Sequence, residues 1–263
     1  MPPSSPRAAR AALPLRTTLG VALIVTVGSA LASCTGAGAT PPPPPANQGA
    51  IVNERPPSQV PLTNQLGQNV TLAGLKGKVV VVAPFLSLCQ DECPLITAAF
   101  IGLQRDLRAA GLARKVVFVE ATVDPGRDTV ARLAAYQKEF GADWDLWTGT
   151  PANVAAFWKA FGVASQQVPE DQPPHLDWFT GQPLTYDVDH TDGYFLIDAK
   201  GRERFIDINA PNLKGKLSRK LTALLNAGGV RGLNHPQQTA WTVNDALASI
   251  SWLLGTTVPP SGR

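Results

Sequence analysis

The stretch Val79-Val80-Val81-Val82-Ala83-Pro84-Phe85 is followed, three residues later, by Cys89-Gln90-Asp91-Glu92-Cys93-Pro94. The continuous apolar run, rich in β-branched residues, is typical of a strand buried on both faces of a sheet. Residues 94–110 then carry apolar side chains at a helical period, and Gly111 ends that pattern. The two cysteines therefore lie between a central strand and a helix, whose N-terminus lowers the pKa of a thiol and favours the thiolate.

The segments after this unit continue the alternation of strands and helices. We expect strands at residues 116–123 and 144–147, helices at residues 128–140, 151–161 and 213–225, and a hairpin formed by residues 194–198 and 203–208. This order predicts an α/β fold, a thioredoxin-like sandwich with a central mixed sheet and a β-hairpin insertion. In open α/β sheets ligands bind at the carboxyl ends of the strands, which is where the cysteines lie.

The spacing of Cys89 and Cys93 bears on their chemistry. Residues at i and i+4 of a regular helix have Cβ atoms about 5–6 Å apart, whereas a relaxed disulfide needs about 3.5–4.5 Å. The pair therefore suits a metal ion, and suits a disulfide only if the loop is not regular helix. Adding the imidazole of His190 gives two sulfurs and one nitrogen, a set that points toward copper. A purely structural disulfide is the alternative.

The N-terminal segment has the features of an export signal. Residues 1–18 carry three arginines and no acid, residues 19–32 are mostly apolar, and the stretch ends in Leu31-Ala32-Ser33-Cys34. Those last four residues resemble a bacterial lipobox, in which the cysteine is lipidated and becomes the new N-terminus. We expect a lipoprotein signal peptide at residues 1–33 and a body anchored by lipid at Cys34 to the extracytoplasmic face of the cell membrane. The alternative is an uncleaved membrane anchor with a free Cys34.

Composition indicates how the rest of the chain is organised. Lipidation of Cys34 would leave Cys89 and Cys93 as a pair in a compartment that permits disulfides, so the pair needs a reducing partner before it can bind copper. Residues 34–61 are rich in proline and predict an extended membrane tether, or a docking site for a proline-binding module. The net charge of +3, without a basic patch interleaved with aromatic residues, argues against nucleic acid as a partner.

Residues 62–227 are long enough for one well-buried domain, which we expect to be the thioredoxin-like, copper-binding part. Residues 228–263 predict a C-terminal helical extension, because apolar residues recur at helical spacing between Ala240 and Leu254. Two tryptophans accompany that pattern. The helix either packs on the domain or offers a surface to a partner or to the lipid interface, where tryptophan is favoured.

Four segments together resemble the Sco/SenC family, copper-binding thioredoxin-fold proteins that serve cytochrome c oxidase assembly. The segments are Gly77-Lys78-Val79-Val80-Val81, Cys89-x3-Cys93-Pro94, Thr122-Val123-Asp124-Pro125-Gly126-Arg127-Asp128-Thr129 and Tyr186-Asp187-Val188-Asp189-His190-Thr191. The chain departs from the family at Gln90, where many relatives have proline, and at Leu88, where they often have threonine. The segment of residues 164–185 is longer and richer in proline and tryptophan than the resemblance leads us to expect, and residues 227–263 look like an addition.

The resemblance implies that Cys89, Cys93 and His190 bind one copper ion and that Asp189 orients the imidazole. It also implies delivery of copper to the binuclear copper site of an oxidase subunit, with other copper carriers or a thiol reductant as further partners and no turnover in the usual sense. The alternative is a thiol–disulfide oxidoreductase that keeps the oxidase cysteines reduced; it needs Cys89 and Cys93 as redox thiols but not His190. A redox or copper sensor is a third possibility.

Other polar residues are expected to be structural. Asp124-Pro125-Gly126 predicts a turn and Asp128 a cap of the following helix, although this charged cluster could also dock a partner. His175 and His235 lie in the proline-rich insertion and in the tail, and we expect both to be ordinary surface residues.

Overall fold

The computed structural model describes residues 41–47, 49–52 and 59–261. These described residues belong to one compact unit. The predicted signal peptide and Cys34 lie outside the described residues.

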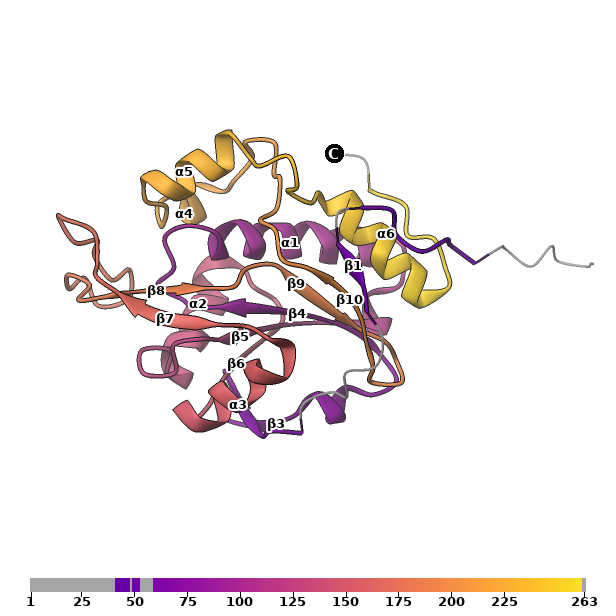
Figure 1. The fold of residues 1–263 in the computed structure, drawn as a ribbon, viewed down its shortest axis with the longest axis horizontal. Coiled ribbons are helices and arrows are strands. Elements are labelled where there is room, and N and C mark those ends of the chain that lie inside the picture. The colour runs from indigo at the N-terminus through magenta and orange to yellow at the C-terminus, as the bar shows by residue number, and fades with distance from the viewer. Residues whose placement is uncertain (1–40, 48, 53–58, 262–263) are drawn as a thin grey trace, which may run out of the picture. The chain divides into compact units, whose positions relative to one another are not determined.

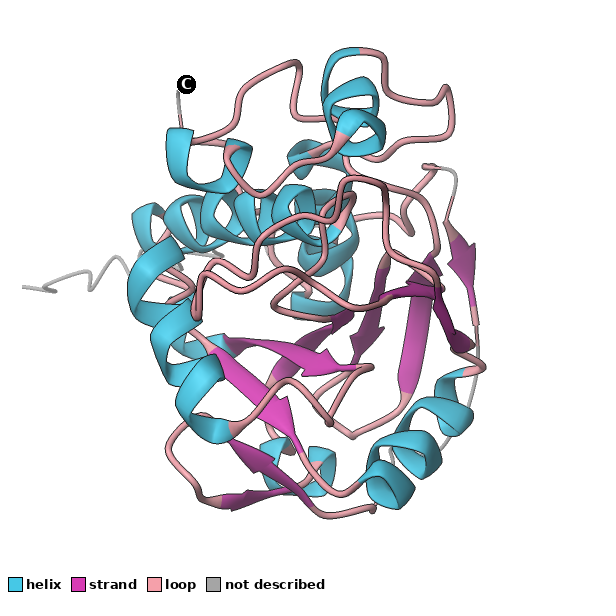
Figure 2. Cartoon of the chain, turned by 90° about the vertical axis from the view of Figure 1, so that its left-hand side faces the viewer, coloured by secondary structure: helices cyan, strands magenta, loops and turns pink. Residues whose placement is uncertain are grey.

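A mixed sheet of eight strands forms the centre of this unit (Figures 1 and 2). Its order is β1 (Ala50–Ile51), β10 (Glu203–Asp207), β9 (Tyr194–Ile197), β4 (Val79–Phe85), β5 (Val116–Thr122), β6 (Asp145–Thr148), β2 (Leu62–Asn64) and β3 (Asn69–Val70). Strands β4, β5 and β6 are parallel, and β9 pairs antiparallel with β4. Every residue of β4 is buried, as its apolar run predicts.

Helices cover both faces of the sheet. They are α1 (Cys93–Ala109), α2 (Val130–Phe140), α3 (Pro151–Phe161), α4 (Arg219–Thr222), α5 (Ala227–Asn234) and α6 (Val243–Leu254), with short 3-10 turns at Leu72–Leu75 and Ala113–Lys115. Figure 1 shows α1 and α6 on one side of the sheet and α3 on the other. Phe100 of α1 packs on Phe118 of β5, while Phe161 of α3 packs on Phe195 of β9, each pair with ring centroids 5.1 Å apart. The α/β thioredoxin-like sandwich is confirmed.

The helix predicted at residues 213–225 is largely wrong. Only α4 is helical within that range, because the chain turns back before it. Lys214 and Gly215 adopt positive φ values of 53° and 70°, and the Asn212 side chain accepts a hydrogen bond from the Lys214 N–H at 3.0 Å. A left-handed pair of this kind cannot continue a helix, so α4 starts anew at its N-cap, Ser218.

Part of the predicted tether belongs to the sheet. Strand β1 lies within residues 34–61 and pairs antiparallel with β10, with Ala50 opposite Ile206. Gly49 directly precedes β1. An added Cβ there would lie 2.1 Å from the Phe205 ring, so only glycine lets the backbone pass this close to the core. The boundary between tether and domain therefore lies earlier than residue 61.

The structure also contains a two-stranded ribbon and a helix that were not predicted. β7 (Ser165–Val168) and β8 (Asp187–His190) form a separate two-stranded sheet within and after the insertion of residues 164–185. Helix α5 precedes the predicted tail helix. The tail helix itself, α6, contacts α1 and β4 and buries Leu247 and Ile250 in the common core. Of the two arrangements expected for this helix, the structure shows the one in which it packs on the domain.

Candidate metal centre

The cysteine pair lies where β4 runs into α1. Cys93 is the first residue of α1, and Pro94 occupies the first turn, where its missing N–H costs no helical hydrogen bond. Cys89 lies in the preceding loop and accepts a hydrogen bond from the backbone N–H of Cys93, with 3.4 Å between nitrogen and Sγ. The start of the helix thus points a donor at the Cys89 sulfur.

His190 brings its imidazole to the two sulfurs from the end of β8. The ligand atoms of Cys89, Cys93 and His190 all lie within 4.8 Å of one another, and His190 Nε2 is 3.4 Å from Cys93 Sγ. Both cysteines are buried free thiols, and the His190 side chain is 3% exposed. The structure thus brings together the three residues that the sequence singled out as ligands.

Neighbouring groups set the protonation of the three side chains. The hydrogen bond with Cys93 outweighs burial and lowers the pKa of Cys89 well below its ordinary value, helped by His190. Burial, and then the Cys89 sulfur, raise the pKa of Cys93. Burial lowers the pKa of His190, but Cys89 and the carboxylate of Asp192 outweigh it and raise the pKa to about 9. These surroundings favour the thiolate form of Cys89 and the protonated form of His190, so binding of a soft cation would release protons from the site.

Asp189 does not orient the imidazole, contrary to the expectation from the resemblance. His190 Nδ1 donates a hydrogen bond to the backbone oxygen of Thr191 at 2.9 Å and lies 3.6 Å from Asp192 Oδ1. Asp189 is exposed on β8, because successive side chains of a strand point to opposite faces. With Nδ1 committed to Thr191, Nε2 is the nitrogen that faces the sulfurs.

Two carboxyl groups beside the site were not singled out from the sequence. Burial, followed by the nearby Asp192 carboxyl, raises the pKa of Glu92 to about 8. Burial likewise raises the pKa of Asp192 to about 6, and the two side chains are hydrogen-bonded to each other. Their positions, directly before Cys93 and two residues after His190, were the available signal.

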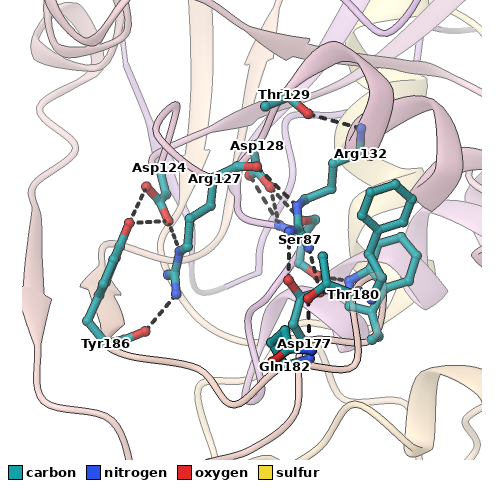
Figure 3. A network of polar contacts seen from close by, with 12 residues as sticks. Ser87, Asp124, Arg127, Asp128, Thr129, Arg132, Asp177, Thr180, Gln182 and Tyr186 are labelled. Atoms are coloured by element: carbon teal, nitrogen blue, oxygen red, sulfur yellow. Dashed lines mark hydrogen bonds and ion pairs between the residues drawn. The ribbon is translucent and has the colours of Figure 1, made fainter.

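The charged cluster after β5 is structural (Figure 3). Asp128 is buried and accepts hydrogen bonds from Ser87 Oγ at 2.5 Å and from Thr122 Oγ1 at 2.6 Å, so it ties the end of β5 to the loop before Cys89. Burial raises its pKa to about 6. The predicted helix cap at Asp128 is wrong, because Thr129 caps α2 by accepting from the Arg132 N–H.

The rest of the cluster closes the turn that the sequence predicted. Arg127 forms an ion pair with Asp124 and donates to the backbone oxygen of Tyr186 at 2.7 Å. The Tyr186 hydroxyl in turn donates to Asp124 at 3.2 Å. The turn is thereby joined to the segment that leads into β8.

The other two histidines stand apart from the sulfurs. His175 Nδ1 lies 3.4 Å from Glu170 Oε1, and its side chain is 37% exposed. His235 is exposed at the end of α5. None of the described helices is long and apolar enough to cross a bilayer.

The family model and the related proteins that this chain matches all belong to one family. The family model described as SCO1/SenC matches residues 55–225. The SCO1 protein homolog of Bacillus subtilis is 28% identical over 140 residues, which cover 53% of this chain and 71% of that protein. The chain spans about half the length of the mouse and bovine mitochondrial SCO homologues that it also matches.

Two solved structures extend the comparison. Apo Sco1 of Thermus thermophilus is 24% identical with a TM-score of 0.50, covering 62% of this chain and 87% of that one. ScoI of Bradyrhizobium japonicum, solved with copper bound, is 28% identical with a TM-score of 0.49, covering 64% and 95%.

Proposed function

The chain belongs to the SCO1/SenC family, and from that premise we propose that it binds one copper ion through Cys89, Cys93 and His190. It then delivers the ion to the copper-bearing subunit of cytochrome c oxidase. The observation that carries the proposal is the convergence of three ligand atoms within 4.8 Å of one another.

The donor set fits this metal. Two thiolates and one imidazole nitrogen are the ligand types that copper prefers among protein side chains, whereas magnesium and calcium prefer oxygen. The Cys89 thiolate is already favoured by its surroundings, so it would be the first ligand to engage. The Thr191 carbonyl fixes the imidazole with Nε2 toward the sulfurs, which removes the cost of orienting that ligand on binding.

Release would proceed by ligand exchange at the His190 side of the site. A surface hollow lined by Ala164, Ser165 and Gln166 borders His190. The two cysteines are buried. A ligand of the recipient protein would enter the site from this hollow, which borders His190.

The proposal includes attachment to the membrane. Residues 1–33 would be removed as a lipoprotein signal peptide, and lipidation of Cys34 would hold the body on the extracytoplasmic face. The proline-rich segment that begins at residue 34 would act as the tether up to β1. The copper-binding domain would extend from β1 to residue 227, with residues 228–263 as its extension. Support comes from the lipobox-like stretch Leu31-Ala32-Ser33-Cys34.

A thiol–disulfide oxidoreductase is the second candidate function, and the lowered pKa of Cys89 supports it. A thiolate is the attacking species in disulfide exchange, and Cys93 would resolve the mixed disulfide. In this case the chain would keep the cysteines of the oxidase reduced. His190 would not be required as a ligand, which separates the two functions.

Complementation tests this choice. Cells that lack the native protein receive wild type, His190→Ala or the matched control His235→Ala, and oxidase activity is measured at low copper. We expect His235→Ala to restore activity and His190→Ala to fail, because a three-ligand site loses its nitrogen donor. Cys89→Ser and Cys93→Ser fail under either function. Full restoration by His190→Ala would contradict the chaperone function and favour the reductase.

A further inference from the structure

The loop that carries Cys89 is held by segments far away in the sequence. Gln90 is buried next to Cys89, and its Nε2 donates to Glu170 Oε1 at 3.0 Å. Glu170 belongs to the insertion of residues 164–185, and its side chain is 4% exposed. From the same insertion, Trp178 Nε1 donates to the backbone oxygen of Ser87 at 2.7 Å. The insertion thus contacts the loop on both sides of Cys89.

The C-terminal part contacts the same loop from another side. The backbone N–H of Asn226 donates to the Gln90 oxygen at 2.8 Å. Gly229, in the first turn of α5, lies so close that an added Cβ would be 2.7 Å from that oxygen and 3.0 Å from the Asp91 oxygen. In Figure 1, α5 and the connection between β7 and β8 both lie at the end of the sheet where β4 runs into α1.

The insertion is itself anchored. Arg132 of α2 makes two hydrogen bonds of 2.7 Å with the carboxylate of Asp177 (Figure 3). The neighbouring Trp178 ring packs edge-on against Tyr136 and Phe140, with centroids 5.8 and 5.1 Å away. A paired guanidinium and carboxylate with fixed geometry resists displacement. Contacts made by Trp178 therefore transmit the rigidity of α2 to the cysteine loop.

The buried Gln90–Glu170 pair contributes less to the stability of the fold than apolar side chains would in the same space. Among the described residues, Gln90 Oε1 and Glu170 Oε2 find no hydrogen-bond partner. A buried polar pair that is only partly satisfied stabilises a fold less than apolar side chains of the same size would. What such a pair does provide is a directional link between the two chain segments.

We propose that Gln90 is a positioning residue that, with Glu170 and Trp178, holds residues 86–92 in the open dithiol arrangement and opposes closure of a Cys89–Cys93 disulfide. The proposal rests on the proposed function, because the open dithiol is the form that offers both sulfurs to copper. A disulfide needs the two sulfurs only about 2.0 Å apart, whereas both cysteines are free thiols here. Since Cys93 is fixed in α1, Cys89 has to move, and the backbone of Gln90 moves with it.

The redox step is ordinary thiol–disulfide exchange. With glutathione disulfide as oxidant, the Cys89 thiolate attacks one sulfur and releases one glutathione thiolate. The Cys93 sulfur then loses its proton, attacks Cys89 in the mixed disulfide and releases the second glutathione. Two electrons and the thiol protons pass from the dithiol to glutathione disulfide, which becomes two molecules of reduced glutathione. The contacts at Gln90 act on the equilibrium constant of this reaction by favouring its reactant.

The test is the reduction potential of the full, metal-free chain, equilibrated with glutathione redox buffers in the presence of a chelator. We expect Gln90→Ala to favour the disulfide about tenfold, which is a potential about 30 mV more negative. Glu170→Ala shifts the potential in the same direction and by at least as much, because it removes the acceptor of Gln90 together with the contacts that Glu170 Oε1 makes with His175. The double variant adds little to Glu170→Ala, because the Gln90–Glu170 hydrogen bond is already lost in that variant. Glu170→Gln keeps an acceptor oxygen and retains the wild-type potential.

Gln137→Ala is the matched control. It removes a comparable amide hydrogen bond, from Gln137 Nε2 to the Trp144 oxygen at 2.7 Å, on α2, and leaves the potential unchanged. If Gln90→Ala does not fold, Trp178→Phe provides the test. It removes the indole N–H that donates to the Ser87 oxygen but keeps an aromatic ring, and it shifts the potential in the same direction. A wild-type potential in Gln90→Ala, or an equal shift in Gln137→Ala, overturns the proposal. Failure of the wild-type chain to bind copper would contradict the proposed function and leave these potentials unaffected.

Discussion

Asp192 is the carboxylate next to the His190 imidazole, and substitution can distinguish its effect on copper binding from that of Asp189. Asp192 lies 3.6 Å from His190 Nδ1, whereas Asp189 is exposed on the strand. We expect Asp192→Asn to weaken copper binding at most about tenfold, because the carboxylate supports the imidazole by its charge at 3.6 Å while the Thr191 carbonyl orients the ring. Asp189→Asn serves as the matched control and retains wild-type affinity. Competition titration with a chromogenic copper chelator measures both, and equal affinities for the two variants would contradict the assignment.

The sequence predicted the three candidate ligands that the structure brings together, but not the residues around them. Cys89 and Cys93 stand out by their spacing, and His190 by the motif in which it lies. Glu170 and Trp178 could not be assigned, because their contacts depend on the path of a long insertion that carries no periodic pattern. Asp189 was wrongly expected to orient the imidazole, because neighbouring residues of a strand point their side chains to opposite faces of the sheet.

At the scale of elements, a buried carboxyl joins α1 to the sheet. Glu120 of β5 is fully buried and accepts hydrogen bonds from Thr97 Oγ1 of α1 at 2.9 Å and from Trp144 Nε1 at 3.0 Å. Burial raises its pKa from 4.5 to about 8, against the effect of these donors. The folded chain therefore binds this proton more tightly than the unfolded chain does. Its contribution to stability is complete below about pH 4.5 and is lost as the pH rises to about 8.

We expect Glu120→Gln to remove this pH dependence. Between pH 5 and pH 8 the free energy of unfolding of the wild type falls on the order of 3 kcal/mol more than that of the variant. Urea unfolding of the metal-free protein at the two pH values measures the difference. Glu139→Gln is the control, since that carboxyl group is half exposed on the surface of α2. Parallel pH profiles for wild type and Glu120→Gln would show that the buried group is not protonated in the folded chain.

The elements themselves were predictable to different degrees. Strand β4 and helix α3 have the predicted bounds, because one is a pure β-branched run and the other begins at Pro151 and ends before Gly162. The predicted helix at residues 213–225 failed at Lys214 and Gly215, whose left-handed backbone no apolar period reveals. Strand β7 was missed because it is polar and mostly exposed, so it lacks the alternation that marks a half-buried strand.

For the whole molecule, the predicted lipid anchor is the feature that lies outside the described residues. We expect Cys34→Ser to abolish lipidation and to release or mislocalise the protein, because two or more acyl chains give stable anchoring. Copper binding by the purified protein stays at the wild-type level, since the site is formed within residues 89–190. Membrane fractionation with mass spectrometry of the mature N-terminus measures this. A Cys34→Ser protein that remains wholly in the membrane would show that another segment is the anchor.

Titration of the fully reduced chain with copper tests the central claim most directly, because it depends on neither the recipient nor the membrane. We predict that the wild type binds one copper ion per chain. We also predict that His190→Ala loses more than about tenfold in affinity, since even groups that only orient a metal ligand contribute about 10–100-fold. His235→Ala, whose imidazole is exposed at the end of α5, retains wild-type binding. Stoichiometric binding by His190→Ala with wild-type affinity would contradict a site formed by Cys89, Cys93 and His190.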